Sequence, residues 1–535
     1  MNGLYIGGFT LTSHKIPRFV CIVGLILLLT PTAAIPALSD GGSNADWPMW
    51  GYDLANHRYN PGEMMLTPAN VGKLQRKWTF AFPNTGIAST TPTVVGDTVY
   101  VGSWNGHVYA LDTTTGTQRW DFNTSMTGKG AAVRVGIVVA HDLVMFGDQA
   151  GRFYALNRAT GVPAWLPQTL DNHPLAQITG SPVVYGDRVY VPMSSREESA
   201  AADFNYACCT FRGSLTALNI SDGSVAWRFY TVDEPEPTEK SSTGIQHSAP
   251  SGAAIWSTPS IDPESGLIYL TTGNGYSNPA ASNTDAILAI SLADGTLRWS
   301  KQVTPGDWAN DGCLLNPPGP NCAGTHGKDL DFGASPLLYM IQTANGPHKI
   351  VAAEQKSGTL YALDALTGEQ VWQRGVGLPT SYAWGMSYDG QRLYVSDNTF
   401  QVNGGVYALD PASGKVLWHS GPMQCTPGAK QIAAECWSGF MAAAISTPGL
   451  VWMGSMDGQV RALDSATGRI LWHANTTGDI MGVNGQKGHG GSIGPSNVTV
   501  ANGQLFVTSG YAAWTSRMLE GNVLVVYGLS QGQLF

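Results

Sequence analysis

Charge of either sign is scarce in this 535-residue chain, and clusters of basic residues are missing from it. Only 13% of the residues are charged, and the formal net charge is -9 at pH 7. Proteins that bind nucleic acids gather Lys and Arg side chains to neutralise phosphates. The sequence therefore argues against nucleic acid as a partner.

The signatures of several common enzyme classes are also missing. The sequence has no Gly-x-Gly-x-x-Gly opening a helix, no P-loop and no His-Glu-x-x-His, and its 11 histidines do not cluster at metal-ligand spacing. It has no Cys-x-x-Cys-His motif, which argues against covalently attached haem c. These absences exclude the usual nucleotide-binding and zinc-peptidase motifs.

One apolar run stands near the N-terminus, and no other segment is long and apolar enough to cross a bilayer. Lys15 and Arg18 precede the run "FVCIVGLILLL" (19–29), and a Pro/Ala/Ser stretch follows it. This order is typical of a secretory signal peptide, with an uncleaved anchor as the alternative. We therefore expect a signal peptide and linker over 1–39. Residues 40–535 should form one secreted or periplasmic domain without a membrane span.

Cysteine usage agrees with export. Of seven cysteines, Cys21 lies in the apolar run, and the other six form local pairs: Cys208 with Cys209, Cys313 with Cys322, and Cys425 with Cys436. An even number of cysteines in an oxidising compartment predicts disulfides. We expect three short-loop disulfides. The alternative for the adjacent pair, whose ring would be strained, is that its thiols are free or bridge elsewhere.

Glycine and tryptophan are abundant, at 65 and 17 residues, and both recur in a repeat. Its pattern is clear in "YALDTTTGTQRW" (109–120). Seven copies occupy 105–120, 150–165, 212–227, 284–299, 357–372, 403–418 and 457–472. Each combines an apolar strand, a tight turn containing Gly, and a second strand ending in Trp. Each copy is therefore predicted to be a β-hairpin.

An eighth unit is divided between the two ends of the chain. The strand "GNVLVVYGL" (521–529) has no Trp strand after it, and "KLQRKWTFAF" (73–82) has a Trp strand with no partner before it. Pairing the two would close a ring and remove exposed sheet edges. The sequence thus predicts an all-β, eight-bladed β-propeller closed by its N- and C-terminal strands.

The spacing of the repeat tryptophans locates the functional loops. Successive steps from Trp78 to Trp472 are 42, 45, 62, 72, 73, 46 and 54 residues. The long third, fourth and fifth steps predict loop insertions, and functional groups concentrate on loops that a rigid scaffold holds. Cys208 and Cys209 lie within the third step.

The repeat resembles the tryptophan-docking motif of the pyrroloquinoline quinone (PQQ)-dependent alcohol dehydrogenases, and "WPMWGYDLANHRYN" (47–60) resembles the opening segment of that superfamily. Four stretches are most similar to its polyvinyl alcohol dehydrogenase branch: "CCTFRGSLTAL" (208–218), "DLDFGASP" (329–336), "WGMSYDG" (384–390) and "GHGGSIGPSNVTVANGQLFVTSGY" (488–511). The resemblance covers the chain after the signal segment. It implies PQQ- and calcium-dependent oxidation of alcohols, with secondary or polymeric alcohols as the expected substrates.

The superfamily holds PQQ between a tryptophan floor and a vicinal disulfide, with Ca²⁺ on the quinone. The resemblance implies that a disulfide between Cys208 and Cys209 forms a flat apolar plate over PQQ. The stretch "AIWSTPSIDPESGLIYLTTGN" (254–274) is similar to the family's floor segment, which implies Trp256 under the quinone and Asn274 on calcium. An amide oxygen suits Ca²⁺, which is a hard cation.

The resemblance also assigns the acids and a cation. A second calcium ligand is expected on the loop 193–209, where Glu198 matches the family best and Glu197 next. The "DLDF" stretch implies Asp331 as catalytic base and as a calcium ligand, although Leu330 replaces the family's Trp. The family's cation corresponds to Lys356.

Alternatives to Asp331 remain among nearby acids. If the family's catalytic aspartate is aligned from Trp299 without a gap, it falls near Asn310 and Asp311 instead of Asp331. The difference arises because an inserted loop with two cysteines separates Trp299 from Asp331. Asp329 is a further calcium or outer carboxylate candidate, and Asp307 is another alternative base.

The implied mechanism is proton removal from the alcohol by Asp331, with Ca²⁺ and Lys356 stabilising charge on the quinone. Because no haem motif is present, we expect a separate electron acceptor such as a cytochrome c. The alternative function is a noncatalytic β-propeller scaffold for protein or glycan binding. Such a scaffold has no need of these site residues together. The sequence does not identify the physiological alcohol.

Overall fold

The structure is a computed structural model that describes residues 45–128, 130–134, 136–322, 324–377, 384–396, 404–421, 425, 438–495, 498–513 and 518–530. The signal segment predicted over 1–39 lies outside these residues and stays a prediction. In the described part of the chain, no helix is long and apolar enough to span a membrane.

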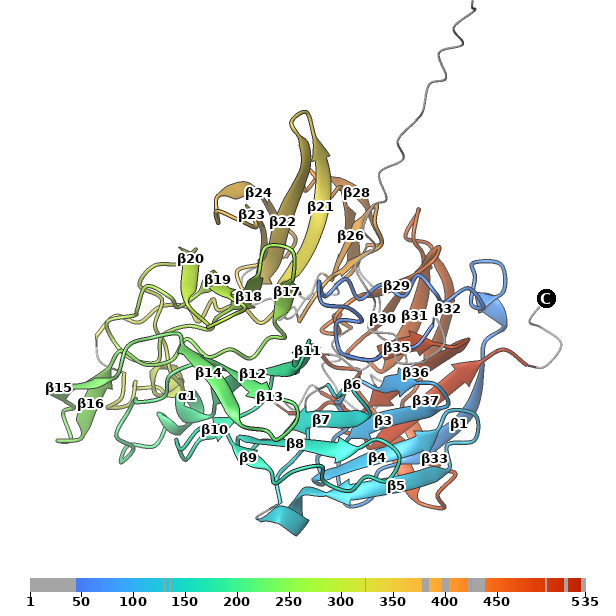
Figure 1. The fold of residues 1–535 in the computed structure, drawn as a ribbon, viewed down its shortest axis with the longest axis horizontal. Coiled ribbons are helices and arrows are strands. Elements are labelled where there is room, and N and C mark those ends of the chain that lie inside the picture. The colour runs from blue at the N-terminus through green and yellow to red at the C-terminus, as the bar shows by residue number, and fades with distance from the viewer. Residues whose placement is uncertain are drawn as a thin grey trace, which may run out of the picture. The chain divides into compact units, whose positions relative to one another are not determined.

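Among the sheets of the described residues, eight antiparallel ones, seven with four strands and one with five, are the blades of a propeller (Figure 1). Seven blades use strands that are consecutive in the chain. The first three are β2 (Thr93–Val95), β3 (Thr98–Gly102), β4 (His107–Asp112) and β5 (Gln118–Asn123); β6 (Val138–Ala140), β7 (Leu143–Gly147), β8 (Arg152–Asn157) and β9 (Gln168–Thr169); and β11 (Val183–Tyr185), β12 (Arg188–Ser195), β13 (Ser214–Asn219) and β14 (Val225–Tyr230), with β10 (Ala176–Gln177) added beside β12.

The next four blades follow in the same way. They are β17 (Ser260–Asp262), β18 (Leu267–Thr271), β19 (Ala286–Ser291) and β20 (Leu297–Gln302); β21 (Leu337–Thr343), β22 (Gly346–Gln355), β23 (Thr359–Asp364) and β24 (Gln370–Gly375); β25 (Ser387–Tyr388), β26 (Leu393–Ser396), β27 (Val406–Leu409) and β28 (Val416–His419); and β29 (Ile445–Thr447), β30 (Leu450–Gly454), β31 (Gln459–Asp464) and β32 (Ile470–Asn475).

The eighth blade joins the two ends of the chain, as the sequence predicts. It has the order β1 (Gln75–Ala81), β37 (Val523–Gly528), β36 (Gln504–Ser509) and β35 (Val498–Ala501). β1 pairs with β37 in antiparallel orientation. This pairing joins the N-terminal strand to the C-terminal strands within one blade and so closes the ring of blades. The predicted eight-bladed fold and its closure are confirmed.

The repeat tryptophans fasten each blade to the next. The indole Nε1 atoms of seven of them donate to backbone oxygens of the following blade over 2.9 to 3.3 Å, in the pairs Trp78–Thr113, Trp120–Arg158, Trp165–Ile220, Trp299–Ala365, Trp372–Pro411, Trp418–Ser465 and Trp472–Leu74. Trp227 has no such hydrogen bond among the described residues. The repeat therefore encodes the contacts between blades as well as the hairpins.

The glycine of each repeat is required by the same contact. Gly368 has a φ of +74°, and a Cβ on it would lie 2.7 Å from the ring of Trp299. A side chain here would be strained by its backbone conformation and would also collide with the indole. Equivalent glycines face the preceding Trp at Gly116, Gly161, Gly223, Gly295, Gly414 and Gly468.

The elements outside the blades are few. They are the hairpin β15 (Glu236–Lys240) with β16 (Gln246–Ala249), the hairpin β33 (Gly478–Met481) with β34 (Lys487–Gly490), the single-turn helix α1 (Glu197–Ala200), and the 3₁₀ turns η1 (Val71–Lys73), η2 (Thr124–Thr127) and η3 (Asp311–Leu314). α1, the hairpin β15–β16 and η3 fall in the third, fourth and fifth steps between repeat tryptophans, respectively. The predicted insertions are confirmed.

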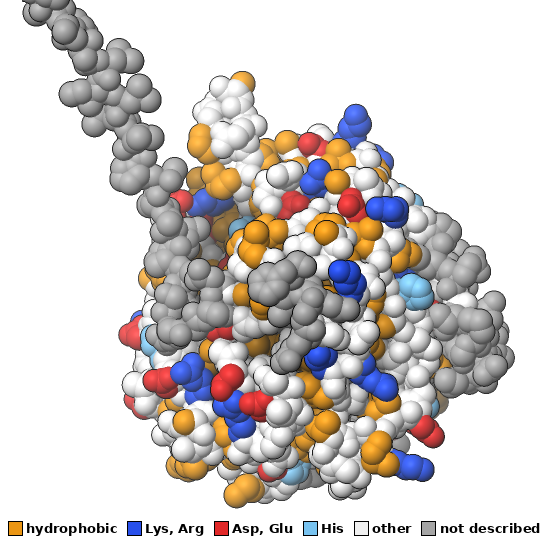
Figure 2. Space-filling view, turned by 90° about the vertical axis from the view of Figure 1, so that its right-hand side faces the viewer, with side chains coloured by type: hydrophobic (Ala, Val, Ile, Leu, Met, Phe, Trp, Pro, Cys, Tyr) orange, Lys and Arg blue, Asp and Glu red, His pale blue; other side chains and the backbone are white. Residues whose placement is uncertain are grey.

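The core lies between neighbouring sheets, where Val, Leu, Ile and aromatic side chains of adjoining blades pack together. Acidic and basic side chains are interspersed on the face shown in Figure 2. The rigid ring therefore holds its inserted loops on a scaffold that is apolar inside.

Candidate active site

Backbone hydrogen bonds tie together four segments that are far apart in the sequence. The amide of Gly273 donates to the oxygen of Ala254 over 2.9 Å, and the amide of Lys356 donates to the oxygen of Asp331 over 3.0 Å. Phe332 N also donates to Thr272 O over 3.2 Å. These bonds place the side chains of neighbouring blades at one site.

Lys356 lies between two carboxylates at this site. Its Nζ is 2.8 Å from Oδ1 of Asp329 and forms a closer ion pair with Oδ1 of Asp331. Lys356 directly follows β22, and both acids lie on the segment before β21. Asp331 is buried, whereas the Asp329 side chain is 36% exposed. The ammonium therefore compensates buried negative charge where solvent screening is weak.

Trp256 connects to the same acid. Its Nε1 donates to Oδ2 of Asp331 over 2.9 Å, and Lys356 Nζ lies 5.6 Å from its ring centroid. A Cβ on Gly333 would lie 2.1 Å from the indole, so this position accepts no side chain. Trp384 meets the indole edge-on, with a centroid distance of 4.7 Å. The indole is therefore fixed in position and in orientation.

Asn274 offers an oxygen without a protein partner. Its Nδ2 donates to the oxygen of Ala309 over 3.0 Å and lies 3.4 Å from Oε1 of Glu198. Its Oδ1 is buried and accepts no hydrogen bond within the described ranges. Leaving such an acceptor unpaired is unfavourable, and the chemistry of the atom suits a hard cation.

The electrostatics of Glu198 agree with a site for positive charge. Burial raises the pKa of Glu198 well above its usual value, and Asp329 adds to this effect. Although the Asp329 side chain is partly exposed, the surrounding protein desolvates its carboxyl group and raises its pKa, against the opposing charge of Lys356. Crowded carboxylates of this kind gain stability from a bound cation.

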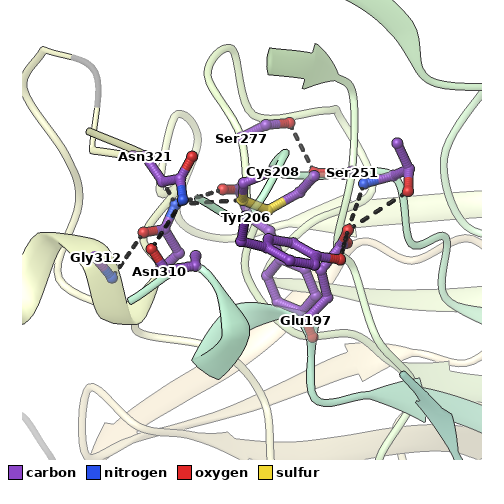
Figure 3. The surroundings of a disulfide bond; sticks show 12 residues. Glu197, Tyr206, Cys208, Ser251, Ser277, Asn310, Gly312 and Asn321 are labelled. Atoms are coloured by element: carbon purple, nitrogen blue, oxygen red, sulfur yellow. Dashed lines mark hydrogen bonds between the residues drawn. A yellow bond between two sulfur atoms is a disulfide. The ribbon is translucent and has the colours of Figure 1, made fainter. Parts of the chain in front are cut away.

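Glu197 faces a different set of groups, although it precedes Glu198 directly. Its oxygens accept from the amides of Thr210 and Phe211, both over 2.7 Å, and from the hydroxyl of Tyr206 over 2.9 Å. The side chain is fully buried beside the Cys208–Cys209 segment (Figure 3). Glu197 therefore holds that segment in place and lies outside the contacts of Asn274.

Two of the predicted disulfides are confirmed, Cys208–Cys209 and Cys313–Cys322. The adjacent cysteines are bonded to each other and are buried at 4% and 0% exposure. Cys425 is also disulfide-bonded, while its expected partner, Cys436, lies outside the described residues. The first bridge is thus a compact apolar plate held on a rigid loop.

Asn310 supports the disulfide plate, a role that the sequence did not reveal. Its Nδ2 lies 3.9 Å from Sγ of Cys208 and donates to the backbone oxygens of Tyr276 and Asn321, both over 3.0 Å (Figure 3). The sequence placed Asn310 in the inserted loop of the fifth step and near the ungapped match to the family's catalytic acid, and neither feature indicates a contact with the disulfide.

Two further acids have other surroundings. Asp307 accepts from the amides of Lys328 and Leu330 over 2.8 and 2.7 Å, so it holds the chain that presents Asp331. Asp285 is fully buried, and neither of its oxygens has a hydrogen-bond partner in the described part of the chain. Burial raises its pKa to about 10, with Asp307 adding to the shift. Nothing in the sequence indicated that Asp285 is a buried acid, because it stands at a position of the repeat where a turn residue is expected.

Comparison with known proteins shows the family to which the chain belongs. The model of the β-propeller domain of glucose/ethanol/alcohol dehydrogenases matches residues 47–312, and that of the outer membrane protein assembly factor BamB matches 243–419, 356–477 and 402–531. The chain is 36% identical to a polyvinylalcohol dehydrogenase of Pseudomonas sp, over 90% of this chain and 77% of that protein. It is 33% identical to one of Sphingopyxis sp., over 93% and 78%.

The fold also matches solved structures. The quinohemoprotein alcohol dehydrogenase of Comamonas testosteroni superimposes with a TM-score of 0.67 at 21% identity, over 91% of this chain and 81% of that one. The fold and the site together define a propeller of the quinoprotein alcohol dehydrogenase type. Within that class, the chain belongs to the polyvinyl alcohol dehydrogenase family.

Proposed function

We propose that this protein oxidises alcohols with PQQ as cofactor and Ca²⁺ as metal, and that secondary or polymeric alcohols are its substrates. The observation that carries the proposal is the contact of Trp256, Asp331 and Lys356, which joins an aromatic face, a carboxylate and a cation at one point. A noncatalytic scaffold would not need this combination, and the curated relatives named above are dehydrogenases.

The residues present fit PQQ. The indole of Trp256 is held from the side by Trp384, and the buried disulfide of Cys208 and Cys209 supplies a second apolar surface. Lys356 offers a positive charge to quinone or carboxylate oxygens. When bound, PQQ supplies the quinone that accepts the two electrons of alcohol oxidation.

The residues also fit calcium. Oδ1 of Asn274 is a buried oxygen without a partner in the described chain, and the Glu198 carboxylate is adjacent to the same amide. Asp331 contributes a nearby carboxylate. Glu198 is the better candidate of the two neighbouring glutamates, because the oxygens of Glu197 already accept hydrogen bonds from the disulfide segment.

Asp331 is the proposed general base. The hydrogen bond from Trp256 orients its carboxylate, and the ion pair with Lys356 keeps negative charge favourable in a buried place. A base held in this way takes the proton of the substrate hydroxyl onto a carboxylate oxygen. Lys356 then stays paired with Asp329, which limits the charge imbalance during the transfer.

The electrons need an acceptor outside the described chain. We propose a separate redox protein, such as a cytochrome c, and a secreted or periplasmic location for the exchange. Disulfides persist in such oxidising compartments, and two pairs are formed here.

The test is reconstitution. Purified protein is titrated with PQQ in the presence of Ca²⁺ or of a chelator, and its melting temperature is followed, because a ligand of the native state raises it. Alcohol-dependent dye reduction is then measured with primary, secondary and polymeric alcohols. We expect a calcium-dependent rise in melting temperature and turnover of at least one alcohol class. Absence of PQQ binding would favour the scaffold function instead.

A further inference from the structure

Two short segments of neighbouring blades carry the aromatic floor and the proposed base. The floor segment, 254–258, contains Trp256 and leads into β17, and the base segment, 331–335, contains Asp331 and leads into β21. Besides the hydrogen bond between Trp256 and Asp331, buried hydroxyl groups connect the two segments. The proposed chemistry does not use these hydroxyl groups.

Thr271 is the centre of the first connection. It is the last residue of β18 and is fully buried. Its Oγ1 donates to the backbone oxygen of Ala334 over 2.9 Å and lies 2.6 Å from Oγ of Ser257. A threonine hydroxyl carries one proton, and because that proton is directed at Ala334, Ser257 is the donor of the second bond. A chain of hydroxyl groups therefore runs from the residue after Trp256 to the base segment.

Ser335 makes the second connection. Its Oγ accepts from the amide of Thr258 over 2.8 Å, and both residues are buried. Its own amide donates to the backbone oxygen of Trp384 over 3.2 Å, and the ring of Trp384 meets Trp256 edge-on. One serine thus ties the base segment to both segments that carry the packed indoles.

The floor segment and the base segment are in close contact. A Cβ on Gly333 would lie 2.1 Å from the indole of Trp256, and the amide of Phe332 donates to the oxygen of Thr272 over 3.2 Å. A hydrogen bond weakens when its atoms move apart by a few tenths of an ångström or lose their alignment. A small displacement of either segment is therefore enough to weaken the bond between Trp256 and Asp331 while the fold stays intact.

We propose that Thr271 and Ser335 are positioning residues for alcohol oxidation, because they hold the floor and base segments where Nε1 of Trp256 meets Oδ2 of Asp331. The inference rests on Asp331 as the proposed base. Both residues act through the position of that carboxylate, since a base works only within hydrogen-bonding reach of the substrate hydroxyl. A misplacement of about 1 Å can slow turnover by as much as about 10²-fold.

Thr499 offers a matched control for Thr271. It is also fully buried, and its Oγ1 donates to the backbone oxygen of Pro92 over 2.7 Å, between the closing blade and the blade β2–β5. Those two blades carry none of the proposed site residues. Thr271→Val and Thr499→Val therefore both remove a buried hydroxyl that bonds to a neighbouring backbone oxygen. Their melting temperatures should fall to a similar extent.

The first measurement uses the protein without PQQ or calcium. The proton on Nε1 of Trp256 gives one nuclear magnetic resonance signal, which is identified by its loss in Trp256→Phe. We expect Thr271→Val and Ser335→Ala to speed the exchange of this proton with solvent about 5-fold or more, because its hydrogen bond to Asp331 weakens. Thr499→Val should keep the rate within about twofold of the parent. Unchanged exchange in Thr271→Val and Ser335→Ala would overturn the proposal.

The second measurement is dye reduction with a small secondary alcohol at saturating PQQ and Ca²⁺. We expect kcat of Thr271→Val and Ser335→Ala to fall about 10-fold, while the dissociation constant of PQQ stays within about twofold. Thr271→Ser keeps the hydroxyl and should recover most of the loss. Thr499→Val should turn over like the parent despite its lower melting temperature. Equal kcat values for Thr271→Val and Thr499→Val would contradict a positioning role.

Failure of the proposed oxidation gives a different result. A parent that binds no PQQ and oxidises no alcohol would refute the oxidation itself. The exchange of the Trp256 proton needs no cofactor, so faster exchange in Thr271→Val and Ser335→Ala would still show that these residues hold Trp256 on Asp331. The two failures are therefore distinguishable.

Discussion

The indole nitrogen of Trp256 donates a hydrogen bond to Oδ2 of Asp331 over 2.9 Å, although 75 residues separate them in the chain. The aromatic floor and the proposed base are therefore one unit. Lys356 touches the other carboxylate oxygen of Asp331, which leaves the acid held from two sides. Changes to any of the three residues should separate the effects of stacking, orientation and charge.

Replacing Asp331 with Asn should remove the proton acceptor and keep the shape of the site. We expect turnover to fall about 10²- to 10⁴-fold, the usual loss for a positioned base, while PQQ affinity changes little. Dye reduction at saturating PQQ and Ca²⁺ measures the first effect, and a PQQ titration measures the second. Asp329→Asn is the matched control, because it also loses an ion pair with Lys356. Parental turnover of Asp331→Asn would place the base elsewhere.

Two substitutions at Trp256 should act on different steps. Trp256→Phe keeps a stacking ring and loses the hydrogen bond to Asp331, so turnover should fall more than cofactor affinity. Trp256→Ala removes the ring, so PQQ affinity should fall first. The two quantities come from PQQ titrations and from rates at saturating cofactor. The idea of a floor would fail if Trp256→Ala bound PQQ as the parent does.

Substitutions of the neighbouring glutamates Glu198 and Glu197 should affect different properties, calcium affinity for the first and thermal stability for the second. Glu198→Gln removes a carboxylate next to Asn274, and we expect calcium affinity to fall on the order of 10-fold. Glu197→Gln should lower the melting temperature, because it weakens a buried acceptor of the amides of Thr210 and Phe211, and should leave calcium affinity near the parent's. Calcium titrations followed by thermal unfolding measure both. Equal calcium affinities in all three proteins would exclude Glu198 as a ligand.

Asp285→Asn should stabilise the protein at neutral and alkaline pH. The folded state keeps the proton of Asp285 up to a pKa of about 10, while the unfolded chain releases it near its ordinary value of 3.8. The unfolded state binds fewer protons in this window, so the contribution of Asp285 to stability falls as pH rises from about 4 to 10.

The stability gain of Asp285→Asn over the parent should thus grow with pH, by up to about 1.4 kcal/mol for each pH unit in this window. Urea unfolding of both proteins, in chelator, at pH 5 and at pH 8 measures it. A difference that does not change between these pH values would show that Asp285 is ionised in the folded state.

Gly368→Ala should destabilise the contact between two blades. The new Cβ would meet the ring of Trp299 at 2.7 Å in a backbone conformation with φ of +74°. Gly266→Ala is the control, because φ is +66° there and nothing lies within 4 Å. We expect Gly368→Ala to lose about 1–3 kcal/mol more than the control in urea unfolding. Equal losses would mean that backbone strain alone requires the glycine.

Local sequence was sufficient for the blades. The turn and the Trp of each repeat lie within sixteen residues, so hairpin geometry and docking are encoded by short segments whose pattern repeats. The pairing of β1 with β37 could be predicted because each end of the chain carries one incomplete repeat. In a closed ring, these two incomplete repeats can pair only with each other. The Cys208–Cys209 and Cys313–Cys322 bridges followed from proximity in the chain.

Only the tertiary structure decided the directions of side chains at the site. Glu197 and Glu198 are adjacent on α1, and successive helical residues point about 100° apart, so one faces the disulfide segment and the other faces Asn274. No local pattern distinguishes them. The contact of Trp256 with Asp331 arises in the same way. It unites loops from different blades, and their meeting point depends on how the whole ring packs.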